Sequence, residues 1–146
     1  MIDIIRGGNI FASRCTALVC PSNCVGVAGG GLALDFRNHF PGAHAEYVAW
    51  CRRGLLVAGG APLFTPMDEA PGRYVVWFPT KNHWRHPSEL QWIDDGLGCL
   101  ELMLQDFVDS VAVPKLGCGL GGLNWSDVFP LIERRLCAID RVEVYE

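Results

Sequence analysis

The sequence predicts an α/β fold in which helices flank a largely parallel or mixed central sheet. Three observations support this prediction: short apolar runs alternate with segments of helical period, one long segment is strongly amphipathic, and glycine-rich loops follow two of the apolar runs. The 146 residues, about half of them hydrophobic, fit a single domain over residues 1–146 with a core of its own.

The first half of the chain contains three predicted strands and two predicted helices. Val19 lies in a continuous apolar run, as in a strand that is covered on both faces. Residues 73–78 are rich in β-branched and aromatic side chains, which favour a strand. In chain order, we expect an edge or early strand at Ile2–Arg6, a strand at Ala17–Cys20, helices at Leu32–Phe40 and at Ala43–Arg53 with Tyr47, Val48 and Cys51 facing inward, and a strand at Arg73–Phe78.

The second half begins with the longest predicted helix, at Ser88–Val108. Ser88 and Gln91 form a capping-box pattern, in which each side chain satisfies a backbone N–H of the other residue. A buried stripe is predicted from apolar residues at three- and four-residue steps, namely Leu90, Ile93, Leu97, Leu100, Leu104 and Phe107. After it we expect a strand at Ser110–Val113, a helix at Trp125–Ala138 capped by Asn124 with Pro130 early in its length, and a strand at Val142–Tyr145.

Composition and charge restrict the functional class. The net charge of −4, with acidic and basic residues intermixed, argues against a broad non-specific nucleic-acid surface and leaves room for a local basic site. The N-terminus lacks a signal-peptide pattern and no apolar run reaches ~20 residues, so we expect a cytoplasmic protein.

No metal is expected from the cysteine and histidine pattern. The seven cysteines contain no CxxC pair, and His83-x-x-His86 lies on a loop with no cysteine or carboxylate beside it. We therefore expect reduced thiols at Cys15, Cys20, Cys24, Cys51, Cys99, Cys118 and Cys137.

Two glycine-rich loops provide the clearest functional evidence. Gly26–Leu32 leads directly into a predicted helix, and Lys115–Leu123 follows a later strand. Backbone amides without Cβ obstruction bind anions, above all at a helix N-terminus. Neither loop is followed by GK[ST], and no GxGxxG follows the first strand. The two loops therefore predict a diphosphate-containing nucleotide held by backbone amides.

Several motifs in this order resemble those of macrodomains. They are Arg6-Gly7-Gly8-Asn9-Ile10, Pro21–Val27 followed by Gly29–Ala33, and Leu116–Trp125. Pro79-Thr80-Lys81-Asn82-His83-Trp84-Arg85 is similar to the DarG-type branch of DNA ADP-ribosyl glycohydrolases, which is related to terminal ADP-ribose protein glycohydrolase. The resemblance spans nearly the whole chain. It implies a three-layer sandwich with a mixed central sheet, ADP-ribose as the ligand, and a metal-independent hydrolase without a cofactor.

The resemblance also implies a set of site residues. Asn9, where macrodomains usually have aspartate, would accept a hydrogen bond from the adenine amino group, and Ile10 would flank the adenine. Lys81 and Asn23 are the implied catalytic residues, with Asn23 facing the distal ribose. The full implied ADP-ribose set is Gly8, Asn9, Ile10, Asn23, Val27, Gly29, Gly30, Gly31, Leu32, Thr80, Lys81, Leu116, Gly117, Cys118, Gly119, Leu120, Gly121 and Gly122.

The implied nucleophile, Lys81, must lose its proton before its amine can attack the anomeric carbon. A nearby diphosphate would raise the lysine pKa, and desolvation by Trp84 or Trp125 would lower it. If the pKa is not lowered, Lys81 would instead act as a proton donor or an electrostatic clamp. His83 is a further acid–base candidate.

The substrate is inferred from two further features. The related protein-directed glycohydrolases carry an aspartate in the second glycine loop where this chain has Gly121, whereas DarG-type enzymes act on ADP-ribosylated thymidine in DNA. Trp84, interleaved with His83 and Arg85, suits contact with a base in single-stranded DNA. The alternatives are hydrolysis of ADP-ribose from protein glutamate or of O-acyl-ADP-ribose, and a reader that binds ADP-ribose without turnover.

A partner also follows from the resemblance. DarG proteins act as antitoxins against a DNA ADP-ribosyltransferase toxin, and a further C-terminal region binds that toxin. This chain ends immediately after its last predicted strand, and its sequence leaves open whether it is a complete enzyme or part of a longer protein.

Overall fold

A six-stranded mixed sheet forms the centre of the protein. The computed structural model describes the backbone of residues 1–146 and every side chain except that of Phe107. The strand order is β1-β6-β5-β2-β4-β3, in which all neighbours are parallel except the edge strand β3, which is antiparallel to β4. The strands are β1 (Ile2–Ile5), β2 (Ala17–Ser22), β3 (Leu63–Pro66), β4 (Tyr74–Pro79), β5 (Ser110–Val113) and β6 (Arg141–Tyr145).

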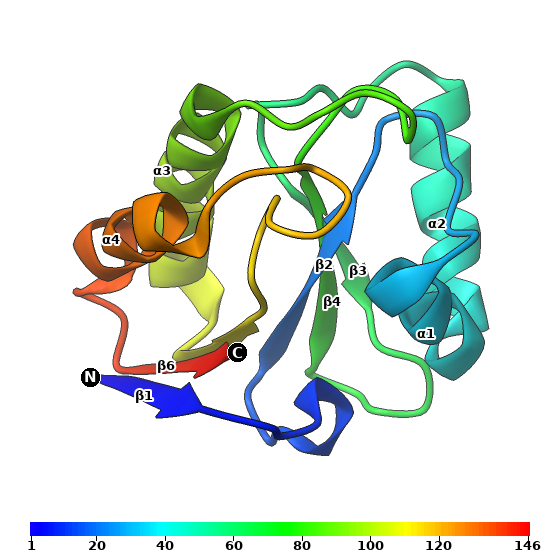
Figure 1. Ribbon diagram of the computed structural model, residues 1–146. Helices are drawn as coiled ribbons and strands as arrows, with labels where there is room; N and C mark the ends of the chain where they lie inside the picture. Colours follow the sequence, from blue (N-terminus) through cyan, green and yellow to red (C-terminus); the bar gives the residue numbers. More distant parts are fainter.

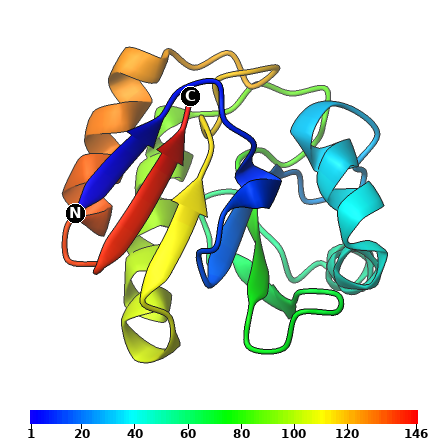
Figure 2. The ribbon, with the colours of Figure 1, turned by 90° about the horizontal axis from the view of Figure 1, so that it is seen from below.

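Two helices cover each face of the sheet (Figure 1; Figure 2). One face is covered by α1 (Gly31–His39) and α2 (Pro41–Arg52), and the other by α3 (Leu90–Phe107) and α4 (Trp125–Leu136). A single 3-10 turn, η1 (Ile10–Ala12), lies between β1 and β2. The predicted three-layer α/β sandwich is confirmed.

Each face has its own hydrophobic core. On the α3–α4 side, the predicted stripe of α3 packs against the inner residues of α4, and Ile93, Leu97, Leu100 and Leu104 are fully buried. Leu90 was predicted to belong to this stripe, but it is 38% exposed because it lies at the first residue of the helix. The predicted position of Phe107 in the stripe falls on a side chain outside those described.

On the α1–α2 side, the core contains Phe36, Tyr47 and Trp77, with the rings of Tyr47 and Trp77 stacked at 4.6 Å. Cys51 is buried as predicted, whereas Val48 is half-buried. This packing fixes α2 beside the end of β2, where the first glycine loop begins.

Three local predictions were wrong. The strand β3 was not predicted, because its four residues end in proline and pair only with one neighbour. The Ser88–Gln91 capping box does not form: Glu89 is the N-cap, Gln91 donates to Asp95, and Ser88 N–H donates to the carbonyl of Gly121. Asn124 occupies the N-cap of α4, but its side chain makes no capping hydrogen bond.

No helix among the described residues has the length and apolar character needed to cross a membrane. The remaining elements agree with the sequence within a few residues at their ends, Pro130 inside α4 included.

Candidate active site

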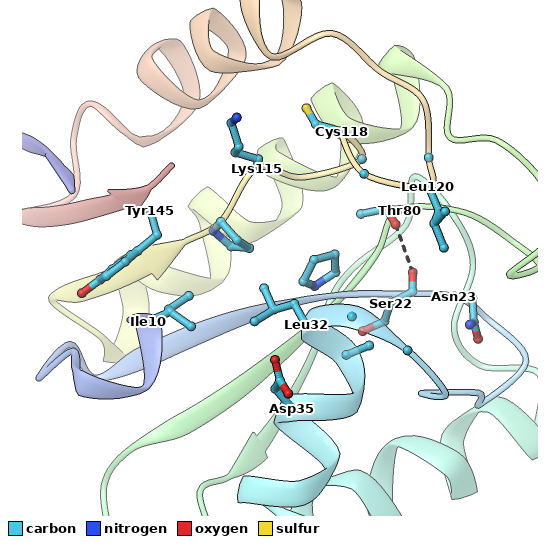
Figure 3. A pocket seen from close by; sticks show the side chains of 18 of the residues that line it. Ile10, Ser22, Asn23, Leu32, Asp35, Thr80, Lys115, Cys118, Leu120 and Tyr145 are labelled. Carbon is cyan, nitrogen blue, oxygen red and sulfur yellow. Dashed lines mark hydrogen bonds between the residues drawn. The ribbon is translucent and has the colours of Figure 1, made fainter. Parts of the chain in front are cut away.

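A cavity of about 1190 Å³ opens where the parallel strands end (Figure 3). Its walls come from the loops after β1, β2, β4 and β5, from α1 along its length, and from the end of β6. Parallel strands bring their carboxyl ends to one edge of a sheet, and ligands of open α/β sheets bind at that edge. The two glycine loops follow β2 and β5, which are adjacent strands, so they meet across the cavity.

The structure brings sixteen of the eighteen residues of the implied ADP-ribose set to this cavity. The exceptions are Gly122 and Leu116, whose side chain is fully buried in the core. Further lining residues were not predicted, namely Phe11, Pro21, Ser22, Ala33, Asp35, His39, Pro114, Lys115, Tyr145 and Glu146. Tyr145 and Glu146 could have been predicted, because the last strand is parallel to its neighbour and must also end at this edge.

Asn23 organises the first glycine loop. Its side-chain oxygen accepts hydrogen bonds from the backbone N–H groups of residues 25, 26 and 27, at 3.1–3.3 Å, and from the Tyr47 hydroxyl at 2.9 Å. Its amide nitrogen donates to the carbonyl of Val27 at 2.8 Å. One N–H of the buried Asn23 side chain is therefore left to contact a ligand.

The second glycine loop is pinned by its own backbone. Leu123 N–H donates to the carbonyl of Gly117, where φ is +72°, and Ser88 N–H donates to the carbonyl of Gly121, both at 2.9 Å. A Cβ at Gly121 would lie 2.5 Å from the oxygen of Gly117 and 2.5 Å from the Ser88 hydroxyl. The loop therefore has no room for an aspartate, or for any other side chain, at position 121.

At the β1–β6 end, the cavity has an aromatic wall (Figure 3). Tyr145 faces Ile10 there, and its hydroxyl donates to the buried carboxylate of Glu143 at 2.9 Å. Asn9 also lines this end, and its side-chain oxygen already accepts from Phe11 N–H at 3.0 Å. One lone pair of that oxygen and the amide N–H groups of Asn9 are left for a ligand.

Glu143 also accepts from the Ser13 hydroxyl and from Arg141, each at 2.7 Å. Burial raises the pKa of the Glu143 carboxyl, but the hydrogen bonds from Ser13, Tyr145 and Arg141 outweigh it and hold the pKa below its ordinary value. Glu143 is therefore a charged acceptor that holds the hydroxyl of Tyr145 in place.

Lys81 lies at the opposite end, just after β4. The preceding residue, Thr80, is tied to the carbonyl of Ser22 by its backbone N–H at 2.9 Å and by its hydroxyl at 3.3 Å (Figure 3). The following residue, Asn82, accepts from Cys24 N–H through its carbonyl and from Ala58 N–H through its side chain. These bonds fix the lysine backbone beside the first glycine loop.

The chemistry of the Lys81 amine is set by partial burial. Its ammonium donates only to the carbonyl of Trp84, at 3.3 Å, and burial lowers the pKa of Lys81. Of the described residues that line the cavity, only Asp35 and Glu146 are carboxylates. Glu146 is already bonded to Arg6 and to the Trp125 indole. No salt bridge in the described part of the chain involves Lys81, so no carboxylate opposes the effect of burial, which makes the proton of this amine easier to lose.

Of the two tryptophans expected to desolvate Lys81, Trp84 lines the cavity and Trp125 does not. Trp84 lines the cavity, with Arg85 4.6 Å from its ring centroid and His83 stacked at 5.2 Å. His83 and Arg85 are not brought to the cavity wall, and the His83 Nδ1 accepts from Arg85 N–H. Trp125, the second tryptophan considered for desolvation, does not line the cavity either, because its indole is held by Glu146.

Burial raises the pKa of the Cys118 thiol in the second glycine loop, which disfavours its nucleophilic thiolate form. Among the described residues, no group of three or more His, Cys, Asp or Glu side chains is placed to hold a metal ion.

Residues 19–132 match the family model described as Macro domain, and this match includes both glycine loops and Lys81. The chain belongs to the macrodomain family. It is 40% identical over 146 residues, or 99% of its length, to a Thermus aquaticus protein named DNA ADP-ribosyl glycohydrolase, of which the match covers 40%. The chain therefore spans about two fifths of that relative.

Solved macrodomain structures agree with this assignment. The macrodomain of Mycobacterium tuberculosis DarG superposes with a TM-score of 0.93 at 36% identity, covering 99% of this chain and 97% of the other. Thermosipho africanus DarTG in complex with ADP-ribose superposes with a TM-score of 0.89 at 33% identity, covering 98% of this chain and 41% of that one.

Proposed function

We propose that this macrodomain binds ADP-ribose in the cavity and hydrolyses its bond to a base in DNA. The observation that carries the proposal is the placement of Lys81, an amine with a lowered pKa, at the end of a cavity whose middle is lined by the two glycine-rich loops. A related protein with this architecture has been solved with ADP-ribose, and two relatives that are 40% identical over 99% and 83% of this chain are named DNA ADP-ribosyl glycohydrolase.

We infer one orientation for the ligand. Adenine lies between Ile10 and Tyr145, the diphosphate lies against the amides of residues 117–121, and the distal ribose lies beside Asn23 and Lys81. Backbone N–H groups can neutralise a diphosphate without a metal ion. The remaining Asn23 N–H donates to a ribose hydroxyl, so Asn23 orients the sugar and does not transfer a proton.

Lys81 acts as the nucleophile in the proposed reaction. The neutral amine forms a bond to the anomeric carbon of the distal ribose, the bond from that carbon to the base nitrogen breaks, and the base nitrogen takes up the proton that the amine loses. The ribose ring of this adduct opens to an imine, water adds to the imine carbon and releases the amine, and the ring closes again. The products are ADP-ribose and the unmodified base, so one water molecule is consumed.

The choice of DNA over protein as substrate is supported by Gly121. A carboxylate at that position cannot be accommodated, because the carbonyl of Gly117 occupies the space that its Cβ would need. The exposed loop at residues 81–86 adds Trp84, His83 and Arg85 beside the opening, where a thymine and its flanking phosphates would lie. The leaving group is therefore a base nitrogen rather than a protein carboxylate.

The biological setting is also part of the proposal. A fusion of DNA ADP-ribosyl transferase and glycohydrolase from Thermosipho africanus is 34% identical to this chain. By analogy, residues 1–146 act as a single domain that reverses the modification made by a DNA ADP-ribosyltransferase toxin in the cytoplasm. The free thiols, such as Cys24 with a pKa raised to about 11 by burial, suit a reducing compartment.

The test is a parallel incubation with thymidine-ADP-ribosylated oligonucleotide and with glutamate-ADP-ribosylated protein. We expect release of ADP-ribose from the oligonucleotide only, and its loss in Lys81→Ala with binding of free ADP-ribose retained. Release from protein alone would contradict the DNA assignment. Tight binding of ADP-ribose with no release from either substrate would indicate a reader.

A further inference from the structure

Four of the loops around the cavity carry a positive charge, whereas the chain as a whole has a net charge of −4. Residues 23–34, 51–62, 80–88 and 114–124 gather at the carboxyl ends of the strands (Figure 1). They contain five basic residues, Arg52, Arg53, Lys81, Arg85 and Lys115, and no aspartate or glutamate, although the whole chain has 12 basic and 16 acidic residues. These four loops are therefore positively charged on an acidic protein, while Asp35 and Glu146 are the carboxylates among the described residues that line the cavity.

Three of these cations lie outside the cavity and are free to bind an anion. Arg52, Arg53 and Arg85 are exposed, none of them lines the cavity, and none forms an ion pair within the described residues. Elsewhere on the protein, arginines such as Arg134 and Arg141 are paired with carboxylates. A group of unpaired arginines attracts a polyanion without first having to give up an internal partner.

Exposed apolar side chains lie between these cations. Leu55 is 45% exposed and Val57 is 56% exposed, and both belong to the loop that follows Arg53. This loop is tied to the lysine loop by the hydrogen bond from Ala58 N–H to the side chain of Asn82, and Trp84, 44% exposed, follows two residues later. Exposed apolar or aromatic side chains therefore lie on both of the hydrogen-bonded loops, beside Arg53 on one and Arg85 on the other.

We propose that a strip formed by Trp84, Arg85, Val57, Leu55, Arg53 and Arg52 binds the single-stranded DNA that flanks the modified base. This inference rests on the proposed function, which places the modified base beside Trp84. Single-stranded nucleic acid is held by cations along its backbone and by apolar or aromatic side chains against its bases. An acidic peptide would use the cations but would leave Leu55, Val57 and Trp84 without bases to cover them.

The test compares two double variants with the same change in charge. Arg52→Gln/Arg53→Gln removes the far end of the strip. Arg14→Gln/Arg37→Gln removes two exposed arginines that also lack ion pairs within the described residues and lie outside the four loops. Affinity for a single-stranded oligonucleotide, with and without ADP-ribosylated thymidine, is measured by fluorescence anisotropy over a salt series. Release of ADP-ribose is measured from the modified oligonucleotide and from the modified nucleoside alone.

We expect the Arg52/Arg53 variant to bind the oligonucleotide about tenfold more weakly at low salt and to lose about 1.4 from the slope of log K against log salt, the value for two phosphate contacts on a single strand. Its affinity for free ADP-ribose and its activity on the modified nucleoside should equal those of the wild type. The Arg14/Arg37 variant should match the wild type in every measurement.

The proposed strip would be contradicted if both double variants had the same slope of log K against log salt. It would also be contradicted if Arg52→Gln/Arg53→Gln reduced ADP-ribose release from the modified nucleoside as much as from the modified oligonucleotide. If Arg52→Gln/Arg53→Gln reduced ADP-ribose release from a modified acidic peptide as much as from the modified oligonucleotide, the strip would bind a protein partner and the DNA proposal would be wrong. Failure of the proposed function is a different result, namely no release from the modified nucleoside by the wild type. In that case the unmodified strand still tests the strip.

Discussion

Gly121→Ala is the substitution that most sharply tests how the second glycine loop is built. The new Cβ would lie 2.5 Å from the Gly117 oxygen and 2.5 Å from the Ser88 hydroxyl, whereas ordinary contacts begin at 3.4 Å. The hydroxyl can rotate away, but the Gly117 carbonyl cannot, because it accepts the 2.9 Å hydrogen bond from Leu123 N–H. The loop must therefore shift or the hydrogen bond must break.

Overpacking of this kind typically lowers the free energy of unfolding by about 1–3 kcal/mol, and we expect a loss of this size for Gly121→Ala. If the loop shifts in the folded protein, the same cost appears as a loss of affinity for ADP-ribose of about 5- to 150-fold. Urea unfolding measures the free energy of unfolding, and isothermal titration calorimetry measures the affinity. We expect Gly121→Ala to have a lower free energy of unfolding, a lower affinity for ADP-ribose, or both. Its circular dichroism spectrum should equal that of the wild type.

Gly119→Ala is the matched control for stability, because a Cβ at Gly119 meets nothing within 4 Å. Its free energy of unfolding should lie within about 0.5 kcal/mol of the wild type. Wild-type stability and wild-type affinity in Gly121→Ala would refute the close packing on which the exclusion of an aspartate depends.

Three further predictions concern the groups around the cavity. The kcat/KM of ADP-ribose release should rise with pH and level off below the ordinary lysine pKa of about 10.4, since burial lowers the pKa of Lys81 and the neutral amine reacts; a pH profile that falls over this range would contradict the nucleophile. Tyr47→Phe should reduce the free energy of unfolding by about 1–2 kcal/mol, because the hydroxyl bonds the carbonyl and side-chain oxygens of Asn23, and calorimetry should show weaker ADP-ribose binding; unchanged stability and binding would count against the role of Asn23. The pKa of Glu143 in the folded protein lies below the value of about 4.3 for an unfolded glutamate. The stability that Glu143 contributes is therefore complete above about pH 4.3 and is lost as the pH falls through the folded pKa. Urea midpoints measured against pH should therefore show wild type and Glu143→Gln converging in acid, and a constant difference would exclude this linkage.

The position of the site followed from the sequence because it depends on topology. Parallel strands end at one edge, and glycine loops after Val113 and Ser22 had to meet there once their strands were neighbours. The helix periods and the fully apolar strands were equally clear in the sequence. Helix periods and apolar strands each depend on many residues that follow a repeating pattern. One atypical residue therefore does not hide them from sequence-based prediction.

Features that arise from tertiary contacts were not predictable in the same way. Ser88 matches a capping residue, but its backbone N–H is taken by Gly121 and its hydroxyl is left buried without a partner among the described residues. The saturation of the Asn23 oxygen by three amides and a phenol also depends on the fold, as does the position of Trp125 beside Glu146. In each case a long-range partner decides between roles that the residue type allows equally.

Borohydride trapping tests the central claim most directly, because it asks whether the Lys81 amine bonds to the distal ribose. Wild-type protein is mixed with thymidine-ADP-ribosylated oligonucleotide, reduced, digested and measured by mass spectrometry, with Lys115 as the internal comparison because it also lines the cavity. We expect an ADP-ribosyl adduct on the peptide that contains Lys81 and none on Lys115. Full release of ADP-ribose with no adduct on Lys81, or undiminished release by Lys81→Ala, would contradict it.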